Sequence, residues 1–398
     1  MKPSILGDLS IEDFLANYWQ KKPLVIRNAF PDFEMPFTAE ELAGLTLDTD
    51  APSRMIIEHG LPPENKPWQV KLSPFDESDF TTLPDSHCTF LVNDLERYIP
   101  ELGNLIEPFR FIPDWRIDDL MVSYAEDQGT VGPHSDDYDV FLIQGEGKRR
   151  WKVITREDYP RDLIPDLPIA LLKEFDEDED WLLNAGDMLY LPPNMPHYGV
   201  AEGACFTFSV GFQAPRTVDL VQNWLETFNQ NKKFTKRFSD AGRKIQDNPG
   251  NITQTDRQTL KSLMLDSIEE EKQNLDIFLG KYLTESKGDA LPENHEIQSD
   301  HFSDYPDTQD YERESWLRLA YFQDGVDDKN DDNSNNNPVH LFADGQHITL
   351  PNEHLKDIQE LCENYYYSSE SLSQLLKEES FKQLFEKLLQ GGGIYPAN

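Results

Sequence analysis

The stretch VGPHSDDYDVFLIQGEGKRRWKVI, residues 131–154, decides the fold class of this chain. Two extended runs, YDVFLIQG and RRWKVI, flank a tight turn that contains Gly145 and Gly147. Two such runs around a glycine turn predict a β-hairpin. The stretch also places a histidine two residues before an aspartate, at His134 and Asp136. The rest of the sequence must decide whether this hairpin carries a metal site or only a polar surface.

Strand geometry separates the cations of the second run into two groups. Successive side chains of a strand point to opposite faces of the sheet. Arg149 therefore shares a face with the apolar side chains of Trp151 and Val153. The opposite face carries Lys148, Arg150 and Lys152. We therefore predict that Arg149 is the buried cation of this strand and that the other face is wet.

Similar short strands continue on both sides of the hairpin, from about residue 118 to residue 213. The runs are DLMVSYA (119–125), WLLNAGDMLYLP (181–192) and CFTFSVGFQ (205–213). Glycine, proline and acidic turns divide them, which is typical of an antiparallel barrel or sandwich. Before them, DLSIEDFLANYWQ (8–20) has helical spacing and PLVIRNAF (23–30) predicts a short buried strand.

Helical periodicity replaces the strands after Pro215. The segments TVDLVQNWLETFNQ (217–230) and LKSLMLDSIEEEKQNLDIFLGKYL (260–283) carry apolar residues three and four apart, so each predicts a helix. Thr255 and Asp256 are the expected caps of the second helix. The sequence therefore predicts a helical region over residues 216–300.

The C-terminal part mixes strands and helices. HLFADGQHITL (340–350) predicts strands, and two amphipathic helices follow it. The asparagine-rich DDKNDDNSNNN (327–337) is a low-complexity insertion. We expect a small α+β domain with a winged-helix arrangement over residues 301–398, after a strand-rich domain over residues 1–215.

Charge and composition limit the classes of function. The 398-residue chain has 74 acidic and 36 basic side chains, for a formal net charge of -38. Such a surface repels a phosphate backbone, which argues against direct nucleic-acid binding and favours a basic partner, unless the charge serves solubility alone. No apolar run approaches the length of a membrane span or forms a signal peptide, so we expect a cytoplasmic protein. The cysteines, Cys88, Cys205 and Cys362, lack the spacing of a disulfide framework or zinc cluster.

The metal hypothesis depends on three residues. In an extended segment His134 and Asp136 project to the same side, and His197 follows three prolines in LPPNMPHYG, which hold the loop that delivers it. Two imidazoles and one carboxylate form the facial triad of non-haem Fe(II) oxygenases, with three positions left open. Zinc hydrolysis with the same ligands is chemically possible, but no general base stands near them. An HxD pair alone is usually a surface turn; the ordered set of three favours the metal site.

A cosubstrate such as 2-oxoglutarate would need a cationic anchor inside the barrel. Arg149 is the candidate because a guanidinium binds a carboxylate in bidentate fashion. Ser123, on the run DLMVSYA, could add a hydroxyl hydrogen bond. Alone, Arg149 would more often be a strand-edge cation. His340, His347 and His354 recur every seven residues but do not share one helix face, so we expect surface positions for them.

Four ordered motifs resemble a known family, the Jumonji-type (JmjC) cupin oxygenases and, within them, the ribosomal oxygenases. The motifs are FLANYWQKKPLVIRNAF (14–30), GPHSDDYDVFLIQGEGKRRWKV (132–153), GDMLYLPPNMPHYG (186–199) and FSVGFQAP (208–215). The resemblance implies an α+β chain: an N-terminal double-stranded β-helix (cupin/JmjC barrel), a helical dimerisation region and a C-terminal winged-helix-like domain. Beyond residue 215 it is one of layout only.

The resemblance also implies an activity. Fe(II) would be held by His134, Asp136 and His197, and 2-oxoglutarate by Arg149 with help from Ser123. With dioxygen, the reaction would hydroxylate the β-carbon of an arginine in large-subunit ribosomal protein number sixteen, a basic substrate. The region 216–300 would form a homodimer, unless its helices pack only within one chain. Two other functions remain open: demethylation of an N-methylated lysine or arginine, and a non-catalytic module that binds ribosomal proteins.

Overall fold

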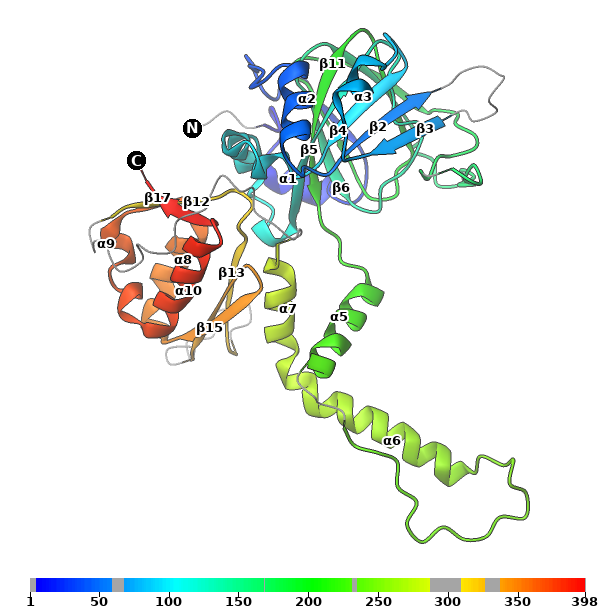
Figure 1. Cartoon of the computed structure of the whole chain (residues 1–398), viewed down its shortest axis with the longest axis vertical. Coiled ribbons are helices and arrows are strands. Elements are labelled where there is room, and N and C mark those ends of the chain that lie inside the picture. The colour runs from blue at the N-terminus through cyan, green and yellow to red at the C-terminus, as the bar shows by residue number, and fades with distance from the viewer. Residues whose placement is uncertain are drawn as a thin grey trace.

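The computed structural model describes residues 5–58, 68–167, 169–230, 235–286, 309–325 and 337–397. Figure 1 shows a strand-rich N-terminal domain, a helical segment that leaves it at one end, and a C-terminal domain beside both. The asparagine-rich insertion, except for Asn337, and the predicted boundary at residues 300 and 301 lie outside the described residues. Within them, no helix combines the length and apolar character that crossing a bilayer requires.

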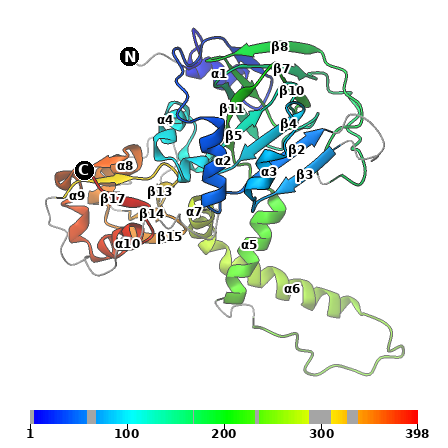
Figure 2. The ribbon, with the colours of Figure 1, turned by 45° about the horizontal axis from the view of Figure 1, so that its top comes forward.

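The N-terminal domain contains two antiparallel sheets. The larger has eight strands in the order β1-β9-β6-β11-β5-β4-β2-β3, and the smaller has the order β10-β7-β8. The strands of the larger sheet are β1 (Leu24–Ile26), β2 (Ser53–Glu58), β3 (Trp68–Leu72), β4 (Cys88–Val92), β5 (Ile117–Ala125), β6 (Asp139–Gln144), β9 (Met188–Leu191) and β11 (Cys205–Phe212). Those of the smaller sheet are β7 (Lys148–Val153), β8 (Glu179–Asn184) and β10 (His197–Ala201). Figure 2 brings the smaller sheet into view beside the larger one.

Side chains of the large sheet alternate between two environments. On β6, Phe141 and Ile143 belong to the large core between the sheet and the helices. Val140 and Leu142 face the other way and pack with Trp151 of β7. The two sheets therefore face each other, as the prediction of a double-stranded β-helix requires. The predicted β-hairpin was wrong: β6 pairs with β9 and β11 in the larger sheet, whereas β7 pairs with β8 and β10 in the smaller one. The turn with Gly145 and Gly147 carries the chain from one sheet to the other instead of pairing its two flanking strands.

Helices cover the outer face of the large sheet. They are α1 (Ile11–Asn17), α2 (Ala39–Asp48), α3 (Glu77–Thr81) and α4 (Gly103–Ile106), with the 3-10 turns η1 (Leu95–Arg97), η2 (Pro100–Leu102), η3 (Glu107–Phe109) and η4 (Asp114–Arg116). Ser10 is the N-cap of helix α1, and its side chain accepts a hydrogen bond from the Asp13 amide. Its fully buried Phe14 meets the Tyr190 ring edge-on at 5.0 Å. Aromatic packing thus stabilises the outer face of the sheet against the helices, which leaves the inner face, toward the smaller sheet, to line a cavity.

The helical segment consists of α5 (Thr217–Gln230), α6 (Gln254–Glu271), η5 (Lys272–Asn274) and α7 (Leu275–Thr284). The sequence predicted one helix over 260–283, but η5 divides it. Helix α7 packs against the C-terminal strands, where Gly280 lies against the Phe342 ring, whereas α6 projects from the body of the chain (Figure 1). Of the two predicted caps, Asp256 takes part in a capping box, but its partner and the N-cap of α6 is Thr253 rather than Thr255.

The C-terminal domain has its own hydrophobic core. One sheet has the order β13-β14-β15 and a second the order β16-β12-β17. Their strands are β12 (Tyr311–Arg313), β13 (Leu319–Gln323), β14 (Val339–Ala343), β15 (Gln346–Leu350), β16 (Tyr366–Tyr367) and β17 (Ile394–Pro396). The helical elements are η8 (Asn352–His354), α8 (Leu355–Glu363), α9 (Ser369–Leu372), η9 (Leu375–Lys377) and α10 (Glu379–Gln390). This mixture of helices with a β-hairpin agrees with the predicted winged-helix arrangement.

Two glycines near the β6–β7 turn allow a test of this fold. Gly147 and Gly203 both have positive φ, at 70° and 79°. An alanine Cβ at Gly147 would lie 2.2 Å from the carbonyl oxygen of Ala204, whereas Gly203 has nothing within 4 Å. We expect Gly203→Ala to cost about 1–2 kcal/mol for the left-handed backbone alone. Gly147→Ala should cost ~1–3 kcal/mol more because the turn must open. Thermal unfolding followed by circular dichroism measures the difference; equal losses would contradict the turn geometry.

Candidate metal centre

A short backbone bridge brings the two histidines together. The amide of His134 donates to the carbonyl of His197 at 3.0 Å, and the amide of His197 donates back at 2.8 Å. The amide of Asn194 donates to the Asp136 carbonyl at 2.6 Å. The extended strand predicted over residues 134–136 was wrong, since β6 begins at Asp139. The bridge with His197, rather than strand alternation, therefore positions the triad.

The possible ligand atoms of His134, Asp136 and His197 all lie within 4.8 Å of one another. One carboxylate oxygen of Asp136 is 3.9 Å from Nε2 of His134, and the other is 3.6 Å from Nε2 of His197. The Nδ1 atoms lie 2.9 Å from the carbonyl oxygens of Gly132 and Met195. These carbonyls favour a proton on each Nδ1, so each Nε2 keeps its lone pair for a metal.

The environment of His197 keeps its ring neutral. Burial, reinforced by nearby His134, lowers the pKa of His197 to about 4, although Asp136 opposes the shift. A neutral imidazole is the form that binds a metal. Two imidazoles and one carboxylate match the donor set of an Fe(II) facial triad. Among the described residues no fourth histidine, cysteine or carboxylate joins the cluster, so it lacks the closed set of a structural zinc site.

Arg149 lies in the same cavity as the triad. Its side chain is buried, and among the described residues its one side-chain hydrogen bond is a 3.7 Å contact with the thiol of Cys205. Its Nε has no hydrogen-bond partner, and within the described ranges no carboxylate forms an ion pair with it. A buried charge without a counter-ion is costly. The guanidinium is therefore suited to an anionic ligand that enters the cavity.

The predicted faces of β7 agree with the structure. Trp151 and Val153 are buried like Arg149. On the opposite face, Arg150 pairs with Asp180 at 2.9 Å and with Glu202 at 2.7 Å. Arg150 is thus engaged at the surface, whereas Arg149 is directed into the cavity.

Ser123 and two hydroxyl residues that the sequence analysis missed line the cavity, which has a volume of about 150 Å³. Ser123 lies opposite Thr207 in the β5–β11 ladder, and Ser209 is two residues further along β11. The signal was present in CFTFSVGF: Thr207, Ser209 and Gly211 occupy alternate positions, and Phe206, Phe208 and Phe212 face the core. Arg149, Ser123 and Thr207 thus provide polar groups that can bind a carboxylate.

Asp119 is a further carboxylate in the cavity that the sequence analysis missed. It accepts a hydrogen bond from the side-chain nitrogen Nδ2 of Asn93 at 3.1 Å. Burial, followed by the charges of Asp94 and Asp118, raises its pKa to about 6. Tyr138, which is 40% exposed, also borders the cavity. The cavity therefore offers an acidic group beside, but separate from, the three metal-ligand candidates.

The three histidines that recur every seven residues, His340, His347 and His354, lie in the C-terminal domain, apart from this centre. The prediction of surface positions was wrong for His354, which is buried and contacts Asp357 and Glu378. His340 and His347 are half-buried on neighbouring strands, with Nδ1 of His340 2.9 Å from Nε2 of His347. Cross-strand packing determined these positions, which spacing along the sequence could not reveal.

The comparisons with known proteins identify two family models along the chain. Residues 104–220 match a JmjC domain, and residues 216–395 match a ROXA-like winged helix. The ribosomal protein uL16 3-hydroxylase of Escherichia coli is 30% identical over 387 residues, which cover 96% of this chain and 97% of that protein. A probable ribosomal oxygenase of Haemophilus influenzae is 38% identical over 262 residues, covering 65% of this chain and 64% of that one.

Solved structures show the same likeness over the whole chain. The structure of E. coli ycfD has a TM-score of 0.80 at 29% identity and covers 98% of this chain and 99% of that one. YcfD in complex with cobalt and 2-oxoglutarate has a TM-score of 0.77 at 29% identity, with the same coverage. The fold is therefore that of a JmjC oxygenase with a C-terminal winged helix. The chain belongs to the family of bacterial ribosomal oxygenases that includes the ribosomal protein uL16 3-hydroxylase.

The position of Arg149 predicts a selective defect. We expect Arg149→Met to weaken 2-oxoglutarate binding about 10- to 100-fold, because a hydrogen bond to a charged group contributes about 1.5–3 kcal/mol. Calorimetry with Co²⁺-loaded protein under nitrogen measures both ligands, and Co²⁺ affinity should change little. Arg150→Met is the matched control on the opposite face and should leave both affinities unchanged. Equal loss of metal and 2-oxoglutarate in Arg149→Met would instead indicate a structural arginine.

Proposed function

We propose that this protein is an Fe(II)- and 2-oxoglutarate-dependent hydroxylase that acts on the β-carbon of an arginine in ribosomal protein uL16. The observation that supports this proposal most strongly is that His134, Asp136 and His197 line the same cavity as Arg149, for which no ion pair is found among the described residues. The hydroxylase activity of the family supports the reaction type, and the printed name of the E. coli relative supports the substrate. A ribosomal substrate also supports a cytoplasmic location.

Each group in the cavity has a proposed task. His134, Asp136 and His197 would hold iron through two Nε2 atoms and a carboxylate, while Gly132 and Met195 orient the imidazoles. Arg149 and Ser123 would bind the distal carboxylate of 2-oxoglutarate, with Thr207 as a further hydroxyl. Bound iron, 2-oxoglutarate and dioxygen supply the oxidant that replaces a C–H hydrogen with a hydroxyl, with succinate and carbon dioxide as co-products.

The substrate arginine needs an anionic partner that leaves the metal ligands free. Asp119 meets this need because its carboxylate lines the cavity without belonging to the triad. A guanidinium binds such a group strongly, and its positive charge would favour the ionised carboxylate that burial disfavours. The net charge of -38 would speed encounter with a basic ribosomal protein and oppose direct binding to nucleic acid.

Two other functions are weaker on the same observations. An N-methyl demethylase would use the same centre, since it also begins with hydroxylation, but its product would lose formaldehyde. A non-catalytic module would have no need for three converging ligands and an unpaired buried arginine in one cavity. The observed groups therefore favour a catalytic centre over a non-catalytic module, and the name of the E. coli relative favours hydroxylation over demethylation.

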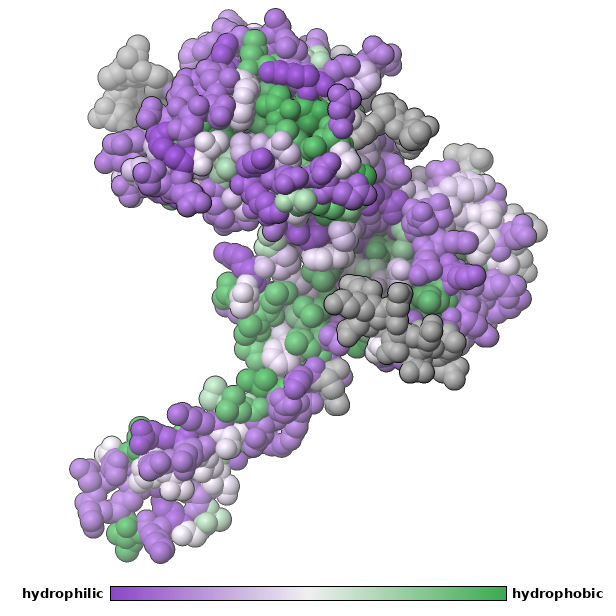
Figure 3. All heavy atoms as spheres, turned by 180° about the vertical axis from the view of Figure 1, so that it is seen from behind, coloured by the Kyte–Doolittle hydropathy of each residue, from purple (hydrophilic) through white to green (hydrophobic). Residues whose placement is uncertain are grey.

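We also propose that α5 and α6 pair with a second copy of this chain. Their exposed apolar side chains recur three and four residues apart: Val218, Val221 and Leu225 on α5, and Leu260, Met264 and Ile268 on α6. Figure 3 shows apolar side chains gathered on the helical segment below the strand-rich domain. Exposed apolar stripes of this kind mark protein interfaces, and a twofold dimer would cover both copies at once.

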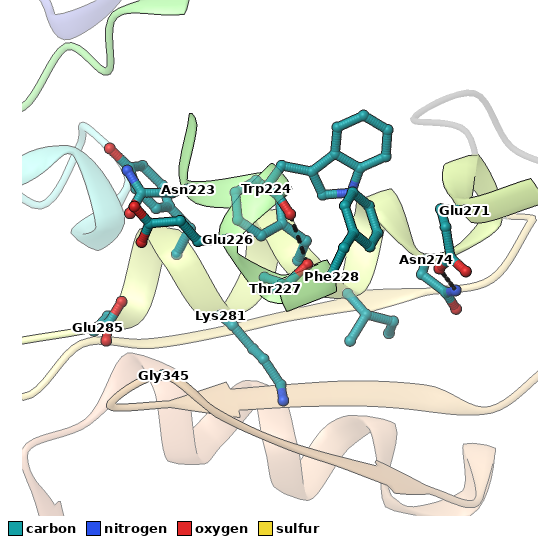
Figure 4. Close-up of a pocket in the computed structure, with 13 residues that line it drawn as sticks. Asn223, Trp224, Glu226, Thr227, Phe228, Glu271, Asn274, Lys281, Glu285 and Gly345 are labelled. Atoms are coloured by element: carbon teal, nitrogen blue, oxygen red, sulfur yellow. Dashed lines mark hydrogen bonds between the residues drawn. The ribbon is translucent and has the colours of Figure 1, made fainter. Parts of the chain in front are cut away.

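A cavity of about 550 Å³ adjoins this surface between α5 and α7. Figure 4 shows Trp224 and Phe228 of α5 beside it, and their rings contact edge-on at 5.1 Å. Lys281 of α7 extends toward the C-terminal strands. The cavity continues the apolar surface inward, which would let a partner helix insert side chains rather than rest on a flat face.

Sedimentation tests the dimer. We expect the wild-type chain to sediment near twice its mass of 46.0 kDa. Met264→Glu should shift the protein toward the monomer because it places a charge in the apolar stripe. Ile245→Glu is the control, since Ile245 is exposed but lies outside both helices. A dimer that survives Met264→Glu, or a wild-type monomer, would contradict the proposal.

Peptide mass spectrometry tests the reaction. Incubation with Fe(II), 2-oxoglutarate, ascorbate and uL16 should add the mass of one oxygen atom to an arginine, without release of formaldehyde. His134→Ala should abolish this product, because the iron would lose one of three ligands. Loss of a methyl group from a methylated peptide would favour the demethylase. Unmodified uL16 would refute the substrate assignment, and His134→Ala activity equal to the wild type would refute the metal centre.

A further inference from the structure

The strand that carries Asp119 is irregular at this residue. The β5–β11 ladder is regular from Cys205 opposite Ala125 to Val210 opposite Leu120, and it resumes with Phe212 opposite Ile117. Two residues of β5, at 118 and 119, therefore face Gly211 alone. Such a bulge twists a strand and changes the direction of its side chains.

Gly211 makes room for the redirected carboxylate. A Cβ at this position would lie 3.1 Å from Oδ1 of Asp119, and the glycine lines the same cavity. The direction of Asp119 thus depends on the path of the β5 backbone across Gly211. Whatever holds this backbone also determines where the carboxylate points.

Two side chains from outside the ladder bind the backbone at the bulge. The amide of Leu120 donates to Oε2 of Glu96 at 3.0 Å, and burial raises the pKa of Glu96 to about 8. On the carbonyl side, Nε of Arg318 donates to the Ile117 oxygen at 2.8 Å, and its Nη2 donates to the Asp118 oxygen. Glu96 belongs to the barrel domain, whereas Arg318 belongs to the C-terminal domain.

The backbone of Arg318 is held in the C-terminal domain by buried neighbours. It lies between Leu317 and Leu319, which both belong to the C-terminal core. Its side chain is itself buried, with 8% of the residue exposed. Beside it, Trp316 lies under the guanidinium of Arg97 at 5.1 Å. Hydrogen bonds of Arg318 therefore connect the core of the winged-helix domain to the β5 bulge.

We propose that Arg318 is a positioning residue through which the C-terminal domain directs Asp119 toward the substrate guanidinium. This inference rests on the proposed role of Asp119 in binding arginine. On this proposal, the winged-helix domain affects the affinity for the substrate through Arg318, although Arg318 does not line the substrate cavity. The alternative is that Arg318 only joins the two domains.

Arg110 provides a matched control for that alternative. It lies at the same domain interface, where its guanidinium donates to the carbonyl oxygens of Cys362 at 2.8 Å and Glu363 at 2.6 Å. It also pairs with Asp114 at 2.8 Å. No hydrogen bond of Arg110 reaches the described bulge residues 117–120. A lysine at either arginine keeps the charge but loses the forked pair of donors.

Amide hydrogen exchange in the full-length protein tests the positioning itself. Arg318→Lys should speed exchange across residues 117–123 by about tenfold relative to the wild type, because the bulge loses one of its two carbonyl contacts. Arg110→Lys should leave exchange in this segment unchanged, even if it lowers the unfolding temperature as much. Unchanged exchange in Arg318→Lys, or equal acceleration by both variants, would overturn the proposal. This readout needs no substrate, so it stands even if the proposed reaction fails.

Binding of a uL16 arginine peptide to the Co²⁺ and 2-oxoglutarate complex tests the functional consequence. Arg318→Lys should weaken the peptide about tenfold, a coupling typical of residues that share a backbone segment, while 2-oxoglutarate affinity stays unchanged. In an Asp119→Asn background the same substitution should have little further effect. Additive effects in this cycle would show that Arg318 acts independently of Asp119 and would overturn the inference. A wild-type protein without peptide affinity would instead refute the proposed substrate, and hydrogen exchange would still decide the role of Arg318.

Discussion

One sheet serves two environments, and the rest of the structure depends on how its side chains alternate. On β11, Phe208 faces an aromatic core and Thr207 faces the cavity, and β5 repeats this with Val122 and Ser123. The apolar half supplies the burial that holds the helices against the sheet. The polar half is thereby free to bind ligands, since the fold does not need it for stability. A register slip of one residue would exchange the two faces and remove both the core and the cavity.

The charged side chains at the cavity differ from their neighbours at the surface in whether they form ion pairs. Arg150 forms ion pairs at the surface with Asp180 and Glu202, whereas Arg149, one residue earlier, is buried without a carboxylate partner in the part of the chain that the structure describes. Asp119 is the complementary case, a half-buried carboxylate that accepts a hydrogen bond from the Asn93 side chain and has a raised pKa. The charged form of each group is stabilised when a ligand of opposite charge binds, because the ligand offsets the loss of hydration that burial causes. This is the electrostatic reason to place a dicarboxylate at one and a guanidinium at the other.

The C-terminal domain is bound to the barrel by arginines that reach backbone carbonyls across the interface, Arg110 in one direction and Arg318 in the other. A guanidinium suits this task because its planar fork satisfies two acceptors at once. The two arginines differ in the element to which the carbonyl groups belong. Arg110 holds the end of a helix, whereas Arg318 holds a bulge in a strand that also lines the cavity. Domain docking and site geometry are therefore connected at one residue.

The sequence by itself determined the barrel and winged-helix architecture, the strands β6 and β7 and the inward direction of Arg149, because period-two alternation and glycine turns are local signals. The pairing of β6 with β7 in one hairpin was wrong, because the partners of each strand come from distant parts of the chain. It also selected His134, Asp136 and His197 as a group, although it gave a wrong local reason, since a backbone bridge rather than a strand aligns them. Only the tertiary structure decided where α6 ends and α7 begins, the burial of His354, and the entry of Asp119 into the cavity. Each of these depends on contacts between residues far apart in the chain, such as Gly280 with Phe342 or Arg318 with the β5 bulge. The physical reason is that contacts between residues far apart in the chain leave no periodic pattern in the sequence that could predict them.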